Sequence, residues 1–323
     1  MNRRLFLAGI AALAAGKSFA QQAAAPWPAR PIRFIVPYAA GGPTDVAARI
    51  LAETLSQRVP QQVVVENITG AGTVVGTTRA AATKDGHSFL IATVAHAVNA
   101  VLYANLSFDP VKDFRGVALM GTVPQIVLVG KNFPGNSLAD LLAAARTKPG
   151  GLSYGSAGIG SAQHLAAELL AKLAQVKLVH VPYRGSGPAV TDLIGGQLDL
   201  VIDSAATALT QVKGGALRAL AVTTKERLPA LPELPTVAET LPGYEAYTWN
   251  AILAPAGTSP EILTGMNRIT NAALADPALA RRFEELGIVV ARNSTPEVTE
   301  AFIAAEMAKW QPLLRSAGIA PNQ

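Results

Sequence analysis

Residues 32–45 decide the fold, and they read Ile-Arg-Phe-Ile-Val-Pro-Tyr-Ala-Ala-Gly-Gly-Pro-Thr-Asp. The first five are β-branched or aromatic apart from Arg33, and they predict a strand. Residues 46–59 follow with Val46 and Ile50 at helical spacing, and they predict a helix. A glycine-rich turn between a strand and a helix can aim several backbone N–H groups at one point, where the helix dipole favours negative charge. The stretch therefore predicts a strand–turn–helix unit with an anion site at its turn.

A second turn of the same kind occupies residues 154–161, which read Tyr-Gly-Ser-Ala-Gly-Ile-Gly-Ser. An expected helix over 161–174 follows it, and Ser161 is suited to cap that helix. The dinucleotide-binding fingerprint is not met, because Gln163 stands where a third glycine is expected. No glycine-lysine-serine sequence of a phosphate loop follows either turn. One such turn can be only a tight connection, whereas two favour an anion held from both sides.

Strand-like and helix-like segments alternate along the chain in two successive units of similar size. We expect strands at 32–36, 62–67, 88–93, 123–130, 153–155, 177–182, 198–202, 217–223 and 248–254. We expect helices at 46–59, 73–82, 137–146, 161–174, 187–194, 262–275, 278–286 and 296–316. Two α/β units, with a tail that returns to the first, are typical of a hinged two-lobe binding protein. The predicted domains are residues 26–126 with 250–323, and residues 127–249, each with a mostly parallel sheet flanked by helices and with the ligand cleft between them.

The first twenty residues have the pattern of a signal peptide rather than of a folded segment. A basic start precedes an apolar stretch over 5–16, and small residues at positions 18 and 20 predict cleavage between Ala20 and Gln21. Arg3 and Arg4 also resemble a twin-arginine signal, and an ordinary secretory signal explains them equally well. Removing the leader takes away three basic residues and lowers the formal net charge from +5 to about +2. We therefore expect an exported protein.

The composition and the motif search argue against several classes of protein. No Lys/Arg run of the kind that binds nucleic acid occurs. The chain has no cysteine, which excludes disulfides and thiolate chemistry, and its four histidines are not spaced as metal ligands. No serine lies in a glycine-x-serine-x-glycine nucleophile elbow. A hydrolase or isomerase on a doubly wound fold would need such groups, so we expect a binding protein without a cofactor, a metal or an enzymatic activity.

Five polar or aromatic residues lie near the expected ends of strands or the start of a helix, where α/β proteins bind ligands. His164 falls one turn into the helix after the second turn, where it either faces the ligand or caps the helix. His96 follows the end of an expected strand. Asp45 and Asp203 each either cap a helix or accept from a ligand amine or a water, and capping is favoured for Asp45. Tyr38 is either a core residue or a ligand contact.

Nine sequence segments, in order along essentially the whole expected mature chain, resemble one known family. They are the two turns extended to Pro37–Arg49 and Tyr154–Leu165, then Val181–Gly185, Asp192–Asp199, Leu217–Val222, Leu234–Glu239 and Ala254–Thr258, with Trp310 and Ala317–Ile319 near the end. Together they resemble the extracytoplasmic solute receptors of tripartite tricarboxylate transporters, known as Bug receptors. The resemblance implies a type II-like periplasmic binding protein, without enzymatic activity, that binds a small carboxylate and delivers it to a membrane permease.

The resemblance also implies a pincer, in which one glycine turn from each domain holds a carboxylate through backbone N–H groups and water. The corresponding positions in this chain are Tyr38, Ala40, Gly41 and Asp45 in the first turn, Ser156, Ala157, Gly160, Ser161 and His164 in the second, and Thr93, His96 and Asp203 elsewhere. We expect a monomer that binds neither nucleic acid nor a metal. A sensor that passes the same ligand to a signalling protein is an alternative that the sequence leaves open.

Two departures from the family pattern lie beside the expected pocket and bear on the identity of the ligand. Many relatives have phenylalanine and prolines where this chain has Tyr38, Ala39 and Ala40. Many also have asparagine-proline where Asn99 and Ala100 stand. A tyrosine followed by small residues makes a wider slot, which favours a dicarboxylate or an aromatic carboxylate.

Overall fold

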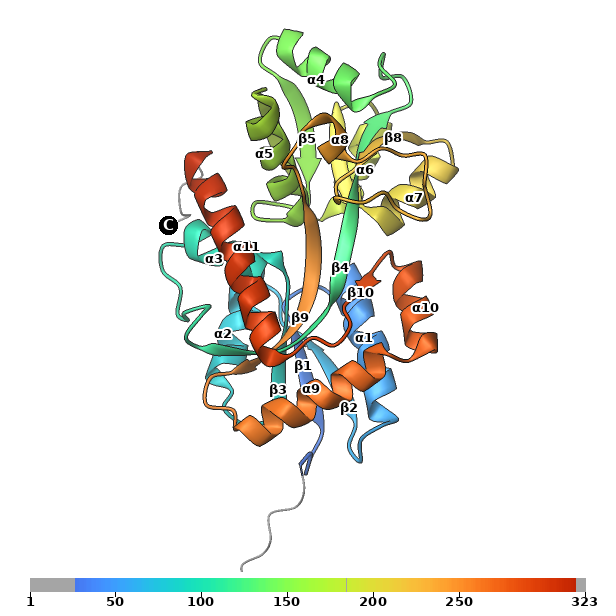
Figure 1. Cartoon of the computed structure of the whole chain (residues 1–323). Helices are drawn as coiled ribbons and strands as arrows, with labels where there is room; N and C mark the ends of the chain where they lie inside the picture. Colours follow the sequence, from blue (N-terminus) through green and yellow to red (C-terminus); the bar gives the residue numbers. More distant parts are fainter. Residues whose placement is uncertain (1–26, 184, 318–323) are drawn as a thin grey trace, which may run out of the picture.

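The computed structural model describes residues 27–183 and 185–317, and it shows two lobes joined by two long strands (Figure 1). The expected signal peptide lies outside the described residues. None of the helices in these ranges combines the length and apolar character that crossing a membrane would need.

Both lobes contain the same βαβαβ unit. In the first lobe it consists of β1 (Ile32–Val36), α1 (Pro43–Ser56), β2 (Val63–Asn67), α2 (Val74–Ala82) and β3 (Ser88–Ala92). In the second it consists of β5 (Leu152–Ser156), α5 (Ala162–Ala174), β6 (Leu178–Pro182), α6 (Ser186–Ile194) and β7 (Leu200–Ser204). The parallel strands lie in the orders β2-β1-β3 and β6-β5-β7. Each unit therefore has a topological switch point beside its first strand, where α/β proteins bind ligands.

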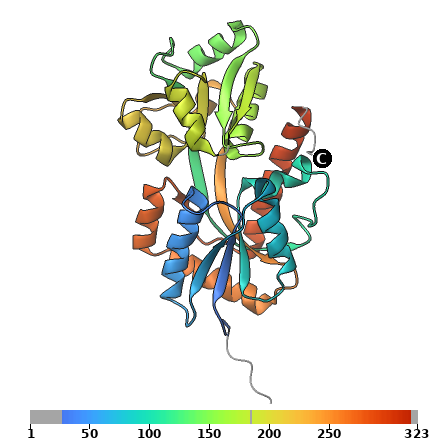
Figure 2. The same cartoon turned by 180° about the vertical axis from the view of Figure 1, so that it is seen from behind.

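The strands β4 (Phe114–Gly130) and β9 (Tyr247–Pro255) connect the lobes (Figure 2). Residues up to Pro124 of β4 pair with β9, whereas Gln125 and later residues pair with β7 and β8 (Leu217–Val222). Proline has no backbone N–H to continue a ladder, so Pro124 suits the point where the partners change. The partners of β4 change between Pro124 and Gln125, and the domain boundaries at 126/127 and 249/250 stay a prediction.

The sheets are mixed rather than mostly parallel, because every pairing of β4 and β9 is antiparallel. The expected strand at 123–130 is only the second half of β4. Two helices that the sequence pattern did not predict follow β3 and β7, namely α3 (Val94–Leu102) and α7 (Ala205–Lys213). In α3 every residue except Ala100 is buried, and its apolar residues continue the apolar run of β3.

The remaining elements cover the sheets. Three helices at the end of the chain agree with the expected ones to within a few residues, namely α9 (Pro260–Leu274), α10 (Pro277–Glu285) and α11 (Pro296–Ser316). Shorter or lobe-specific elements are η1 (Ala71–Thr73), α4 (Leu138–Thr147), α8 (Val237–Thr240) and β10 (Val289–Val290).

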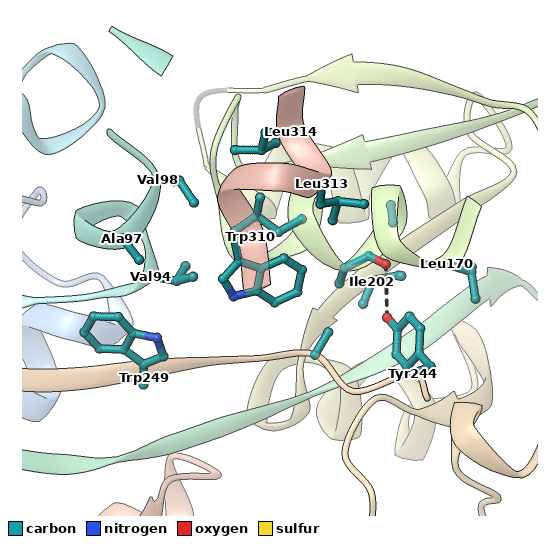
Figure 3. Packing of buried hydrophobic residues seen from close by; sticks show 14 of the residues in the cluster. Val94, Ala97, Val98, Leu170, Ile202, Tyr244, Trp249, Trp310, Leu313 and Leu314 are labelled. Atoms are coloured by element: carbon teal, nitrogen blue, oxygen red, sulfur yellow. Dashed lines mark hydrogen bonds between the residues drawn. The ribbon is translucent and has the colours of Figure 1, made fainter. Parts of the chain in front are cut away.

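Helix α11 belongs to the tail of the chain but contacts both lobes. Trp310 and Leu313 of α11 share one apolar cluster with Val98 of α3 and Leu170 of α5 (Figure 3). Glu306 of α11 is buried as well, and it accepts hydrogen bonds from two indole N–H groups (Trp249 and Trp310, both 2.9 Å). Helix α11 therefore packs in the first lobe and also contacts α5 of the second lobe.

Candidate ligand-binding site

Four helices begin at the carboxyl ends of the first and third strands of the two parallel units. Helices α1 and α3 follow β1 and β3 in the first lobe, and α5 and α7 follow β5 and β7 in the second. The first N–H groups of a helix have no partner within the helix, and the dipole makes this end positive. In each lobe, two helices therefore begin with their positive ends beside the switch point.

The first turn is held by the side chain of Asp45, the third residue of α1. Gly41 has a φ of +82° and donates its N–H to Oδ2 of Asp45 over 2.8 Å. Arg49 donates to the same oxygen over 2.9 Å, and Asn67 donates to Oδ1 over 2.8 Å. Burial by itself would raise the pKa of Asp45, but the bonds from Arg49, Gly41 and Asn67 outweigh it and hold the pKa below its ordinary value. Asp45 is therefore an ionised residue that shapes the turn.

The second turn is held in the same way by His164, the third residue of α5. Gly160 has a φ of +78° and donates its N–H to Nδ1 of His164 over 3.1 Å. Ser161 caps α5, since its hydroxyl accepts from the N–H of His164 over 3.3 Å. The N–H of Gly158 donates to Oγ of Ser156 over 3.0 Å. Two of the N–H groups in this turn are thus taken by side chains of the same turn.

Behind the second turn lies a stack of three rings. The His164 and His180 ring centroids are 4.2 Å apart, and those of Tyr154 and His180 are 4.8 Å apart. Nε2 of His180 lies 2.6 Å from Oγ of Ser156, and the Tyr154 hydroxyl donates to Glu168 over 2.7 Å. Burial, and then the neighbouring His180, lowers the pKa of His164 to about 3, and burial lowers that of His180 to about 4. Both imidazoles are therefore neutral at neutral pH.

Several backbone N–H groups of the two turns find no acceptor among residues 27–183 and 185–317. They belong to Ala40, Thr44 and Asp45 in the first turn and to Ala157, Ile159, Ala162 and Gln163 in the second. Such groups are suited to bind an anion.

The two lobes meet beside these turns. A cavity of about 200 Å³ is lined by Gly41 and Pro43 of the first turn and by Ser204 and Thr207 at the start of α7. Its other walls are Val46, Val123, Ala206, Asn250, Leu286 and Ile288. The second turn touches the opposite lobe as well, because a side chain at Gly160 would collide with Leu102 of α3.

Tyr38 and Thr93 connect the first turn to the start of α3. The Tyr38 hydroxyl lies 2.5 Å from Oγ1 of Thr93, which also accepts from the N–H of Ala95 over 3.3 Å and so caps α3. Burial raises the pKa of Tyr38 to about 12, although the bond with Thr93 acts in the opposite sense. Both side chains support the site, and Ala40 beside them is exposed.

The structure does not bring the ring of His96 to the two turns. Its Nε2 lies 2.9 Å from the carbonyl oxygen of Pro110, and the ring packs edge-on against Phe114 with the centroids 5.1 Å apart. The ring lines a different cavity, which it shares with Met307 of α11. Burial lowers the pKa of His96 to about 4 despite the bond with Pro110. His96 is thus a core histidine in this structure, because a residue one turn into a buried helix faces the neighbouring core.

Asp203 lies at the end of β7 and is buried behind the start of α5. Gln163 donates to its Oδ1 over 3.2 Å, and Oδ2 has no hydrogen-bond partner in the described ranges. Burial raises the pKa of Asp203. Within the same ranges no group of three or more acidic or histidine side chains is arranged to hold a metal ion.

Sequence reasoning missed three groups that border or support the site. Ser204 and Thr207 were not identified from the sequence, because helix α7 was not predicted. A serine at the end of a strand is nevertheless a common residue at the start of a helix. His180 escaped because nothing in its sequence neighbourhood indicates that it stacks on His164. Its role depends on the pairing of β5 with β6.

The fold and the two glycine turns are those of a two-lobe solute-binding protein. Residues 47–319 match the family described as the tripartite tricarboxylate transporter family receptor. A structure of the periplasmic binding protein BugD is 36% identical, with 92% of this chain and 100% of that chain covered and a TM-score of 0.81. The structure of Rpa4515 from R. palustris with adipate is also 36% identical, with 92% and 100% covered and a TM-score of 0.83.

A third structure, MatC from Rhodopseudomonas palustris with bound malate, is 32% identical over 89% of this chain and 99% of that chain, with a TM-score of 0.78. The chain belongs to the tripartite tricarboxylate transporter receptor family, known as the Bug family. It is therefore a periplasmic solute-binding receptor rather than an enzyme.

Proposed function

We propose that this receptor captures a small organic carboxylate between its two glycine turns and delivers it to the permease of a tripartite tricarboxylate-type transporter. The observation that carries the proposal is the set of N–H groups, without acceptors among the described residues, on turns from opposite lobes. The lobes close around the ligand by bending where β4 and β9 cross between them, near Pro124. This is the usual motion of a two-lobe binding protein.

Backbone donors are sufficient for this task without an arginine. Hydrogen bonds to a charged group contribute about 1.5–3 kcal/mol each, so four N–H groups offer about 6–12 kcal/mol. A micromolar dissociation constant corresponds to about 8 kcal/mol. Because association also costs translational and conformational freedom, the turns must be in place before the ligand arrives. The bonds from Gly41 to Asp45 and from Gly160 to His164 support such a preformed site.

The rest of the ligand is accommodated in the cavity beside the first turn. Its walls combine aliphatic side chains, such as Val46, Val123 and Ile288, with the hydroxyl groups of Ser204 and Thr207. Such a lining suits a carbon chain or an aromatic ring together with a few polar substituents. We therefore favour a dicarboxylate or an aromatic carboxylate, and the adipate and malate complexes of two relatives support the dicarboxylate.

The protein acts in the periplasm as a monomer after loss of its signal peptide. Export by the general secretory or the twin-arginine route removes residues 1–20 before Gln21. Mass spectrometry of the periplasmic protein tests the cleavage site. A mature chain that retains residues 1–20 would contradict this part of the proposal.

The central experiment is a thermal-shift screen followed by calorimetry with adipate, malate and benzoate, and with glucose and lysine as controls. At least one carboxylate should stabilise the protein in a saturable way, because only the folded state binds it. Stabilisation by glucose or lysine but by no carboxylate would overturn the proposal. Chemical turnover of a bound acid would contradict a receptor.

A further inference from the structure

The two turns are the same local construction built twice. In each, a glycine just before the helix cap has a φ near +80° and donates its N–H to a side chain four residues later. The acceptor is the third residue of the following helix, Asp45 in α1 and His164 in α5. Because glycine alone adopts this conformation without strain, the acceptor's role is to choose one orientation of a flexible turn.

The two acceptors differ in charge. Asp45 is ionised, and Arg49 lies beside it with Nε 2.9 Å from Oδ2. His164 accepts through Nδ1, so its single proton is on Nε2 and the ring is neutral. Nε2 of His164 lies 4.0 Å from Oε1 of Glu168, and the His164 ring stacks on the ring of His180. The second turn is therefore ordered by an acceptor that adds no negative charge.

This arrangement determines which donors of the second turn are available. The N–H groups of Gly158 and Gly160 are taken by Ser156 and His164. The N–H groups of Ala157, Ile159, Ala162 and Gln163, which come before, between and after these two, have no acceptor in the described ranges. The turn thus has two sets of N–H groups, one bonded within the turn and the other available to a ligand.

We propose that His164 is the positioning residue of the second turn, where its neutral imidazole holds Gly160 so that the remaining N–H groups converge on the ligand carboxylate. The inference rests on the proposed function for the identity of the anion. A carboxylate in place of the imidazole would hold the turn equally well but would repel the ligand at close range. At the first turn Arg49 lies beside the carboxylate of Asp45, whereas the second turn uses an acceptor that is itself uncharged. An uncharged acceptor is therefore part of the proposal for the second turn, and His164 does not itself contact the ligand.

Three substitutions at one position separate these effects. His164→Asn keeps a neutral acceptor near the place of Nδ1, His164→Asp keeps an acceptor but adds a charge, and His164→Leu removes the acceptor. His87→Leu is the matched control, because His87 lies before the amino end of β3, away from both turns. All variants are compared with the native protein by circular dichroism before use.

The first readout needs no ligand. Amide exchange of Gly160, followed by NMR, should be slow in the native protein, in His164→Asn and in His164→Asp, and about tenfold faster in His164→Leu, since one hydrogen bond is lost. Equal exchange in the Asn and Leu variants would overturn the positioning role. This outcome is independent of whether any carboxylate binds, so it is distinct from a failure of the proposed function.

The second readout is calorimetric affinity for each of adipate, malate and benzoate that the native protein binds. His164→Asn and the His87→Leu control should remain within about threefold of native, whereas His164→Leu and His164→Asp should bind about tenfold or more weakly. Raised salt should restore part of the affinity of His164→Asp only, because its defect is electrostatic. An Asp variant that binds as tightly as the Asn variant would overturn the requirement for a neutral acceptor.

Discussion

Asp45 shows how a carboxylate can lie in a turn for which we propose anion binding. Its two oxygens accept from Gly41, Arg49 and Asn67, and the amide of Asn67 also donates to the carbonyl of Tyr38 over 3.0 Å. The side chain is almost completely buried, so its charge is directed inward to these donors. The N–H groups on the outer side of the turn are left for a ligand.

Replacement of Asp45 by alanine should lower the free energy of unfolding by about 2–4 kcal/mol, because three donors lose their acceptor. Asp45→Asn should cost less, since its amide oxygen still serves one or two of them. Urea denaturation at pH 7 measures both values. An alanine variant as stable as the native protein would show that Asp45 does not hold the turn.

The stacked histidines make stability depend on pH. Their folded pKa values, about 3 for His164 and about 4 for His180, lie below the unfolded value near 6.5. The unfolded chain therefore binds more protons between these values, so the stabilisation is complete above pH 6.5 and falls as the pH drops toward 4. The groups that face His164 are His180, Tyr154 and Glu168, and Glu168 alone among them favours the protonated ring.

We expect each of these two histidines to add up to about 1.4 kcal/mol per pH unit to the slope of unfolding free energy in this window. His164→Asn should lower that slope, while His87→Asn serves as the control for a histidine remote from the stack. Urea denaturation between pH 4.5 and 7.5 gives the slopes. Identical slopes in the native protein and His164→Asn would contradict a buried neutral ring.

Helix α11 illustrates how one element links distant parts of the chain. Glu306 holds the indole of Trp310 on its own helix and that of Trp249 on β9. Lys309 lies over the Trp310 ring, with Nζ 4.6 Å from the centroid. The buried carboxyl group of Glu306 therefore has hydrogen-bond partners, as burial of a polar group requires. These bonds hold the helix against the strand that enters the first lobe from the second.

Glu306→Leu should reduce the free energy of unfolding by about 2–4 kcal/mol, because two buried indole N–H groups lose their acceptor. Glu306→Gln keeps an acceptor and should cost about 1 kcal/mol. Tryptophan fluorescence during urea unfolding reports both, since the indoles themselves change environment. A Leu variant no less stable than the Gln variant would contradict this account of the helix.

At the scale of the whole molecule, the lobes touch at Gly287 as well as at the two turns. Gly287 lies between α10 and β10 with a φ of +68°, and a Cβ there would be 3.2 Å from the backbone nitrogen of Ala206 in α7. A larger side chain at this position would separate the lobes. Gly257 has a φ of +89°, and a Cβ added there would have no atom of the described residues within 4 Å. It is therefore a control for backbone strain alone.

Gly287→Leu should weaken carboxylate binding about tenfold or more and prevent the decrease of the radius of gyration that ligand-dependent closure should produce, which small-angle scattering measures. Gly257→Leu should lose similar stability, because both sites disfavour a side chain at positive φ, but it should close normally. Calorimetry with the best carboxylate of the screen measures the affinities. Full closure in Gly287→Leu would show that this contact does not limit the approach of the lobes.

Much of the fold follows from local sequence. The strands of both parallel units and the three tail helices lie close to their expected positions, because period and turn chemistry involve residues near one another. The elements that were missed depend on distant partners. Helix α3 is almost completely buried, and its apolar residues read as a continuation of β3. The first half of β4 is a strand because β9, more than a hundred residues later, pairs with it.

The sequence by itself determined where the two glycine turns stand, which helices they open and that a residue able to accept a hydrogen bond, Asp45 or His164, follows Gly41 or Gly160 by four positions, since these relations lie within one turn of chain. Only the tertiary structure decided which way the histidines face. His96 turns to the core between α3 and α11, whereas His164 turns back under its own glycine against His180. The reason is packing: a ring one turn into a helix goes where neighbouring strands and helices leave room for it, and those neighbours come from far along the chain.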